Sequence, residues 1–187
     1  MKQTNYSRIA ILKLSSLGDI IHTLPAFSIL RKSYPGAKIS WIAAPAGAKL
    51  LENFPGIDEI IVVDLKSPSL VNKFREVKRI ISKYRGKFDL IIDFQGLLKS
   101  AVLAYLLKSY TVGFHKKNLR EPLARFCYNK SASIFAEGRH VIWKNIHLAG
   151  MSTGSAGRPS QGEIVIAYPP LKEVRLSESA AKFFAEN

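Results

Sequence analysis

Short apolar runs alternate along the chain with longer stretches whose apolar residues recur every three or four positions. The apolar runs indicate buried strands at 8–14, 38–43, 59–63, 88–92 and 110–113. The longer stretches predict helices at 19–34, 47–53, 70–83 and 97–107. Strands that alternate with helices predict a Rossmann-like, doubly wound α/β domain, in which a parallel sheet is covered on both faces.

The pattern changes after residue 113. Helices are expected at 121–128 and at about 139–148, so a single domain is predicted for residues 1–150. The run at 151–162 is rich in Gly, Ser and Pro and predicts a linker. Residues 163–187 then hold one strand and one helix, too little for a domain. We expect this stub to dock on the first domain or to belong to a C-terminal part that is missing.

The composition excludes several classes of protein. Hydrophobic residues make up 47% of the 187 positions, which excludes disorder. A lone Cys127 excludes an internal disulfide and a cysteine-based zinc cluster, and the histidines lack metal-ligand spacing. The first residues lack the pattern of a secretory signal, and the longest apolar run, 101–107, is too short to span a bilayer. The expectation is therefore a soluble protein of a reducing, cytoplasmic compartment that holds no metal.

Positive charge is concentrated in the middle of the chain. The chain has 28 Lys and Arg against 14 Asp and Glu, and residues 66–130 hold 15 of those basic residues but only 4 of the acidic ones. This asymmetry favours a polyanionic partner such as an anionic lipid surface, a charged glycan or a nucleic acid. The alternative is a solvated basic helix face. Aromatic–basic RNA-binding motifs and helix-turn-helix spacing are absent, which argues against nucleic acid.

The loop after the first strand is the first place to expect a ligand. Open α/β sheets bind ligands outside the carboxyl ends of their strands. Gly18 allows a close backbone approach, but the loop matches neither the dinucleotide fingerprint nor a P-loop. Asp19 has two interpretations, a cap for the next helix or a general base that accepts a proton at the sheet edge. Pro25 predicts a kink or an irregular first turn in that helix.

Three separated motifs resemble one enzyme family. Lys13-Leu-Ser-Ser-Leu-Gly-Asp-Ile-Ile-His-Thr-Leu-Pro-Ala26 resembles the opening signature of the bacterial lipopolysaccharide heptosyltransferases, glycosyltransferase family 9, and most of all their type I branch. Asp93-Phe-Gln-Gly-Leu-Leu-Lys-Ser-Ala101 and Arg120-Glu-Pro-Leu-Ala-Arg-Phe-Cys-Tyr-Asn-Lys130 agree with the same family in the same order. The resemblance covers residues 8–150, the N-terminal half of such enzymes.

The resemblance implies both a fold and a reaction. The fold is the N-terminal, acceptor-binding domain of a two-domain GT-B glycosyltransferase. The reaction is an inverting, metal-independent transfer of L-glycero-D-manno-heptose from ADP-heptose to Kdo of the lipopolysaccharide inner core. The donor substrate is the only small molecule implied, with no further cofactor. Since the family binds ADP-heptose through a C-terminal domain missing from this sequence, the chain alone is expected to be weak or inactive. The alternative is a non-catalytic module that binds an anionic glycolipid.

Several residues match functional positions of the family. Asp19 matches the proposed catalytic base, and Lys13, Ser15, Ser16 and Gly18 match the loop that shapes the acceptor cleft. Arg120 matches a basic residue that meets the acceptor's carboxylate or phosphate, because its guanidinium binds such groups through two hydrogen bonds. The remaining acceptor-binding candidates are His22, Gln95 and Lys99.

Each secondary candidate also has a simpler interpretation. For Arg120 the alternative is a surface salt bridge with Glu121 or another acid, and for Lys99 it is a solvated helix residue. His22 also fits a core histidine, and Asp93 is expected to cap the helix that follows it.

The implied acceptor, Kdo-lipid A, gives the basic middle segment a natural partner. Its carboxylates and phosphates lie in an anionic leaflet, so a basic face would hold the enzyme on the inner face of the inner membrane without an anchor. Nucleic acid is not an expected partner.

Overall fold

The computed structural model describes residues 5–65, 67–135 and 138–153. The stub predicted at 163–187 lies outside these residues, as does the predicted linker from residue 154 onward. Residues 151 and 152 complete the last described helix.

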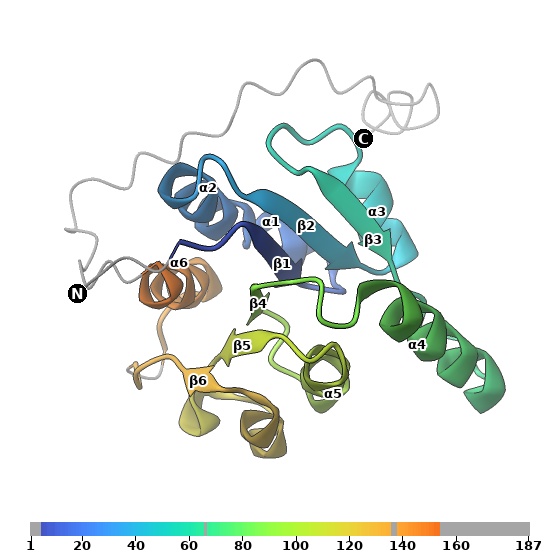
Figure 1. Ribbon diagram of the computed structural model, residues 1–187. Helices are drawn as coiled ribbons and strands as arrows, with labels where there is room; N and C mark the ends of the chain where they lie inside the picture. Colours follow the sequence, from blue (N-terminus) through green and yellow to red (C-terminus); the bar gives the residue numbers. More distant parts are fainter. Residues whose placement is uncertain (1–4, 66, 136–137, 154–187) are drawn as a thin grey trace, which may run out of the picture.

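Six parallel strands form one sheet, which confirms the Rossmann-like α/β prediction (Figure 1). Its spatial order is β3-β2-β1-β4-β5-β6, and every neighbouring pair is parallel. The strands are β1 (Arg8–Leu12), β2 (Lys38–Ala43), β3 (Glu59–Val62), β4 (Leu90–Asp93), β5 (Tyr110–Gly113) and β6 (Lys130–Ser131). Five of them lie where the apolar runs predict strands.

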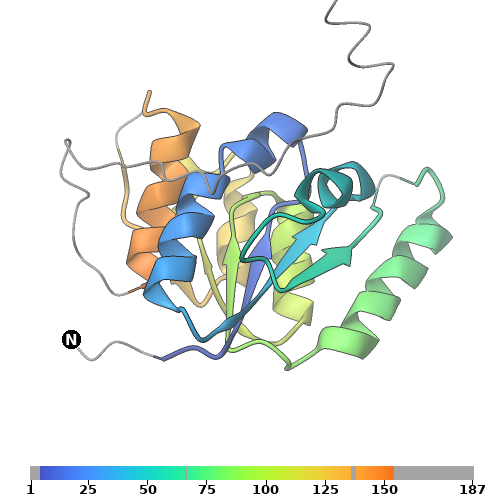
Figure 2. The same cartoon turned by 90° about the horizontal axis from the view of Figure 1, so that it is seen from above.

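Helices cover both faces of the sheet (Figure 2). The α-helices are α1 (Leu17–Ile21), α2 (Leu24–Ser33), α3 (Pro45–Leu51), α4 (Leu70–Tyr84), α5 (Leu98–Leu106) and α6 (Val141–Ser152), and the 3-10 helices are η1 (Lys116–Asn118) and η2 (Pro122–Cys127). Helices α2 and α6 lie side by side on one face, while α4 and α5 bury apolar residues against the other.

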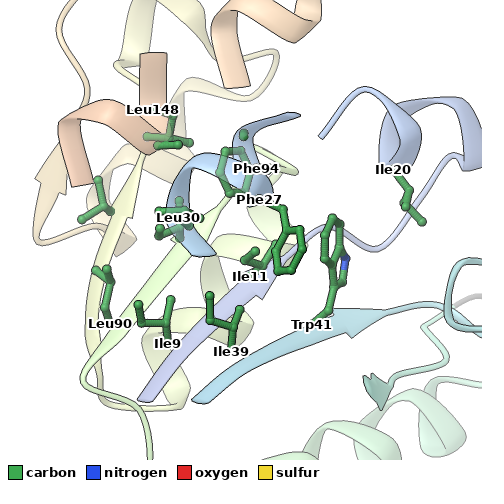
Figure 3. Packing of buried hydrophobic residues seen from close by; sticks show 14 of the residues in the cluster. Ile9, Ile11, Ile20, Phe27, Leu30, Ile39, Trp41, Leu90, Phe94 and Leu148 are labelled. Atoms are coloured by element: carbon green, nitrogen blue, oxygen red, sulfur yellow. The ribbon is translucent and has the colours of Figure 1, made fainter. Parts of the chain in front are cut away.

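Side-chain alternation along β1 explains the two layers. Ile9 and Ile11 point into the cluster beneath α2 and α6, whereas Ala10 and Leu12 point into the cluster beneath α4 and α5. In the first cluster, Phe27 of α2 packs on Trp41 of β2 (Figure 3). Burying a large side chain of this kind stabilises a fold by about 1.5–3 kcal/mol, so the two layers hold the helices on the sheet.

The predicted helix over 19–34 is in fact two helices. Helix α1 ends at Ile21, and α2 begins at Leu24 with Pro25 in its first turn. A proline costs little there because the first N–H groups of a helix have no partner within it. Thr23 sits at the junction and donates its hydroxyl to the Asp19 carbonyl at 2.8 Å. Pro25 therefore starts a second helix and does not kink the first.

The segment after residue 113 also differs from its prediction. The expected helix at 121–128 is the 3-10 helix η2, and the two-residue strand β6 follows it. Lys130 and Ser131 pair in parallel with Val112 and Gly113 of β5. Because β6 is short and polar, it carries no apolar run by which its sequence would indicate a strand.

The order of strands reverses between β1 and β4, and this places the candidate site. From β1 the chain moves outward to β2 and β3, then crosses back to β4 on the other side of β1. Such a reversal opens a crevice at the carboxyl ends of the two central strands. Helix α4 makes the return crossing from the carboxyl edge of the sheet to its amino edge, so its N-terminus lies on the same edge as this crevice.

Candidate active site

A cavity of about 200 Å³ opens at the carboxyl ends of β1 and β4. It brings together four of the predicted residues, Lys13, Asp19, Gln95 and Arg120. The rest of its lining comes from the β4–α5 loop, the segment after β5 and helix α6, and consists of Phe94, Gly96, Leu97, Phe114, Asn118, Leu119, Val141, Lys144 and Asn145. Residues more than 120 positions apart in the sequence therefore share one cavity.

Lys13 and Asp19 form a close pair at the floor of this cavity. Lys13 is only 5% exposed, and its Nζ donates to the Phe94 carbonyl at 3.1 Å and lies 3.8 Å from Asp19 Oδ2. Burial lowers the pKa of Lys13, and the negative charges of Asp19 and Asp93 partly oppose this effect. The Asp19 side chain is 41% exposed, so a solute in the cavity can reach its carboxylate.

Asp19 lines the cavity and also caps its own helix, α1. As the third residue of α1, it accepts the Ser16 N–H on Oδ2 at 3.1 Å, which is half of a capping box. Within the described residues, its other oxygen, Oδ1, accepts no hydrogen bond. The capping hydrogen bond and the contact with Lys13 therefore both involve Oδ2 of this carboxylate.

The Gln95 side chain connects the loops that follow β1 and β4. Its Oε1 accepts the N–H groups of Leu14 at 2.9 Å and Ser15 at 3.1 Å. The Gln95 N–H is itself held by Asp93 Oδ1 at 2.9 Å. The backbone that leads into Asp19 is thus fixed relative to the neighbouring strand.

Asp93 does not cap the following helix, contrary to the expectation from sequence. Its carboxylate is completely buried behind the cavity. Oδ1 accepts the N–H groups of Gln95 and Gly96, and Oδ2 accepts the hydroxyls of Ser100 at 2.9 Å and Tyr128 at 2.8 Å. Burial raises the pKa of Asp93, and these four hydrogen bonds oppose the rise. The turn between β4 and α5 is built around this group.

Two cationic side chains reach the cavity from different elements. Arg120 is exposed beside η2, and within the described residues no carboxylate pairs with it. Its neighbour Glu121 instead accepts the Leu98 N–H at the start of α5. Lys144 comes from α6, with Nζ 5.9 Å from the centroid of the Phe135 ring. Together they give the rim a positive charge.

A buried amide fixes α6 at the site. Asn145 Nδ2 donates to the His22 carbonyl and to Thr23 Oγ1, each at 3.1 Å. This links α6 to the junction that follows α1, the helix in which Asp19 lies. Helix α6 is thereby held in the place from which Lys144 reaches the cavity.

The other predicted residues lie around the cavity but do not line it. Ser15, Ser16 and Gly18 form the loop between β1 and α1, which carries Asp19. The His22 ring meets the His140 ring edge-on, with centroids 5.4 Å apart. Lys99 is exposed in the first turn of α5. Among the described residues, no group of three or more His, Cys, Asp and Glu side chains is placed to hold a metal ion.

Sequence reasoning missed Asn118, Lys144 and Asn145. Lys144 and Asn145 fall within the helix predicted at 139–148, but their periodicity does not reveal which element that helix packs against. Asn118 lies in η1, for which the sequence carries no helical signal.

The family model described as glycosyltransferase family 9 (heptosyltransferase) matches residues 77–179. Lipopolysaccharide heptosyltransferase 1 of Escherichia coli strain K12 is 30% identical over 166 residues, which are 86% of this chain and 52% of that protein. The chain belongs to glycosyltransferase family 9. The enzyme of the same name from Pseudomonas aeruginosa strain PAO1 is 35% identical over 141 residues, or 72% of this family 9 chain and 39% of the relative.

The family 9 chain is also similar to a solved structure in its fold. The structure of E. coli heptosyltransferase WaaC with ADP-2-deoxy-2-fluoro heptose matches with a TM-score of 0.73 at 30% identity, over 85% of this chain and 52% of that one. The chain therefore spans about half the length of the relatives that it matches.

We predict that the Asp93–Tyr128 hydrogen bond stabilises the fold most strongly at neutral pH. Tyr128→Phe removes one donor from a buried carboxylate, so we expect a loss of about 1.5–3 kcal/mol in the free energy of unfolding, measured with urea near pH 7.5. Because the pKa of Asp93 is already raised, and rises further without this donor, the carboxyl group becomes protonated in the folded variant as the pH falls. The deficit should therefore shrink as the pH falls from about 7.5 toward the ordinary range of an aspartate pKa, because the raised pKa of Asp93 lies above that range.

Tyr84→Phe provides a matched control. Tyr84 donates to Glu59 Oε1 at 2.7 Å, but this carboxylate is partly exposed and keeps Lys38 as a partner. We expect a smaller loss, about 0.5–1 kcal/mol. A Tyr128→Phe deficit that is equally small, or that grows as the pH falls, would contradict the role assigned to Asp93.

Proposed function

We propose that this chain forms the acceptor half of a lipopolysaccharide heptosyltransferase. The proposed reaction transfers L-glycero-D-manno-heptose from ADP-heptose to a Kdo sugar of the inner core, with inversion at the anomeric carbon. The observation that carries the proposal is the pairing of a reachable carboxylate, Asp19, with the buried cation Lys13 at the reversal of strand order. Membership of glycosyltransferase family 9 gives that pair its chemical context.

In the proposed mechanism, Asp19 acts as the general base. Its carboxylate takes the proton from a Kdo hydroxyl, and the resulting oxygen nucleophile attacks the anomeric carbon of heptose. The bond from that carbon to the diphosphate oxygen breaks, and ADP leaves with the electron pair. Attack from the face opposite the leaving group inverts the configuration in a single displacement. No step of this scheme assigns a role to a metal ion.

Lys13 is proposed to position the base. Its ammonium lies 3.8 Å from Asp19 Oδ2 and is held in place by the Phe94 carbonyl. This contact holds the Asp19 carboxylate in a fixed position at the cavity. Gln95 supports the same geometry because its amide oxygen holds the loop that leads to Asp19.

The cationic rim is proposed to bind the acidic part of the acceptor. Arg120 reaches the cavity from the segment just before η2, and Lys144 reaches it from α6. Each can bind a sugar carboxylate or a phosphate. Those basic residues of segment 66–130 that lie at the carboxyl edge of the sheet extend this attraction to the acceptor's membrane surface. We accordingly propose a peripheral location on the cytoplasmic face of the inner membrane.

The first test replaces the proposed base. Asp19→Asn keeps the size of the side chain but removes its proton-accepting charge, so we expect kcat to fall by about 10²–10⁴-fold. The assay uses an enzyme completed by the C-terminal half of E. coli lipopolysaccharide heptosyltransferase 1, with ADP-heptose and Kdo-lipid A. Binding of a Kdo-containing glycolipid, measured separately, should remain.

Glu52→Gln is the matched control, since Glu52 is an exposed carboxylate at the end of α3 and does not line the cavity. It should leave kcat unchanged. Wild-type turnover by Asp19→Asn would refute the general base. No turnover by the completed wild-type enzyme, with acceptor binding intact, would instead favour a non-catalytic glycolipid-binding module.

A second test addresses the rim. Arg120→Ala should raise the KM for the acceptor by about 10-fold or more while changing kcat less, because it removes a hydrogen bond between charged groups. Arg120→Lys should recover only part of the affinity, since lysine lacks the two-pronged geometry. Lys87→Ala removes the same charge from the loop at the amino edge of the sheet and should leave KM unchanged.

A third test concerns the 187 residues alone. We propose that they bind the acceptor but transfer at most trace amounts of heptose, because the donor is bound by a part of the enzyme outside them. The purified chain should bind a Kdo-containing glycolipid but release almost no ADP from ADP-heptose. Robust turnover by the monomeric chain would overturn this proposal.

A further inference from the structure

The first two turns of α4 expose an apolar tip. Leu70 is 79% exposed, Val71 62% and Phe74 71%, although all three are large hydrophobic residues. The second half of the same helix packs normally, with Ile80 and Tyr84 buried against the sheet. Helix α4 runs along the outer side of the domain in both views (Figures 1 and 2). Within the described residues, nothing covers its first half.

Cations follow the apolar tip on the same side of the helix. Arg75 lies four residues after Val71, and Lys78 lies four after Phe74, so each stands one turn further along the same face. Both are exposed, and within the described residues neither pairs with a carboxylate. Arg79 differs, because it binds Glu76 and the Val62 carbonyl and so fastens α4 to β3.

The tip lies on the edge of the sheet that carries the cavity. Helix α4 starts at the carboxyl edge, since it leads from the end of β3 back to the start of β4. Helix α1 starts on the same edge, and its Leu17 and Ile21 are 48% and 43% exposed. A flat surface that met the tip of α4 would therefore lie near the opening beside Asp19.

We propose that the first half of α4 docks on an anionic lipid bilayer. Leu70, Val71 and Phe74 enter the boundary between headgroups and acyl chains, while Arg75 and Lys78 contact headgroup phosphates. An apolar stripe with basic residues beside it is the pattern of a helix that lies in a membrane interface. Among the described residues, no helix is long and apolar enough to span the bilayer.

The charge pattern favours lipid over a protein partner. Lysine is depleted from the cores of protein interfaces, whereas Lys78 stands directly beside the exposed Phe74. A second copy of the chain would bring two cationic surfaces together, which electrostatic complementarity disfavours. The inference rests on the proposed function only for its choice of membrane, because the acceptor of that reaction is an anionic glycolipid.

Flotation with vesicles that contain no sugar acceptor tests the proposal. The full 187-residue chain should bind vesicles of phosphatidylcholine with about 30% phosphatidylglycerol and bind pure phosphatidylcholine far more weakly. Leu70→Ala/Phe74→Ala should weaken binding to the anionic vesicles by about tenfold or more. Arg75→Gln/Lys78→Gln should weaken it by about tenfold and flatten its dependence on salt.

Two controls match these changes on the opposite edge of the sheet. Tyr105→Ala removes an aromatic ring that is 63% exposed near the end of α5, and Arg85→Gln/Lys87→Gln removes two charges just after α4. Both should retain binding to within about twofold. Equal losses in the controls would show attraction by net charge alone and would overturn the assignment to α4.

Other occupants of this face give different results. If a second copy covers it, sedimentation will show a dimer that Leu70→Ala/Phe74→Ala dissociates, with vesicle binding unchanged. If another part of the chain covers it, the same variant will lower the thermal unfolding temperature and spare vesicle binding. Either result overturns the proposal. Since these vesicles contain no Kdo and the assay needs no ADP-heptose, failure of the transfer reaction does not affect this test.

Discussion

The buried carboxylate of Asp93 is the interaction on which the site depends. Its four hydrogen bonds join the turn after β4, the first turn of α5 and the ring of Tyr128 before β6. A buried carboxylate is costly unless its oxygens are satisfied, so these elements must come together for the fold to be stable. The turn it builds presents Gln95, whose side chain fixes the loop before Asp19. One buried charge thereby orders a cavity that it does not line.

The cavity combines two kinds of electrostatic environment. At its floor, Lys13 is buried and its charge is directed at Asp19. At its rim, Arg120 and Lys144 are accessible from solvent and available to an anion. This separation fits the proposed reaction, in which the rim cations would bind the acidic sugar while Lys13 holds the Asp19 carboxylate in position. Removal of Asp19 and removal of Arg120 therefore address different steps.

The proposed membrane contact and the proposed acceptor cleft share one edge of the sheet. This coincidence follows from topology, because the crossing helix after β3 must start where the strands end. In the proposed reaction, this arrangement would bring a membrane-bound sugar to the side of the sheet that carries Asp19. Segment 66–130, which holds the excess of basic residues, includes both α4 and Arg120. It therefore contributes cations to the proposed membrane contact and to the proposed acceptor cleft.

The sequence by itself determined the layered fold and indicated the loop that carries Asp19. Apolar runs indicate five of the six strands, since buried parallel strands are apolar throughout. The loop ending in Asp19 could be located because parallel strands carry their ligands at their carboxyl ends. Only the tertiary structure decided that Asp93 is fully buried, that Gln95 holds the loop before Asp19, and that Arg120 and Lys144 reach one cavity. Their roles depend on contacts between segments far apart in the chain, and local periodicity contains no information about such contacts. Strand β6 was missed for the same reason, because only its pairing with β5 makes it a strand.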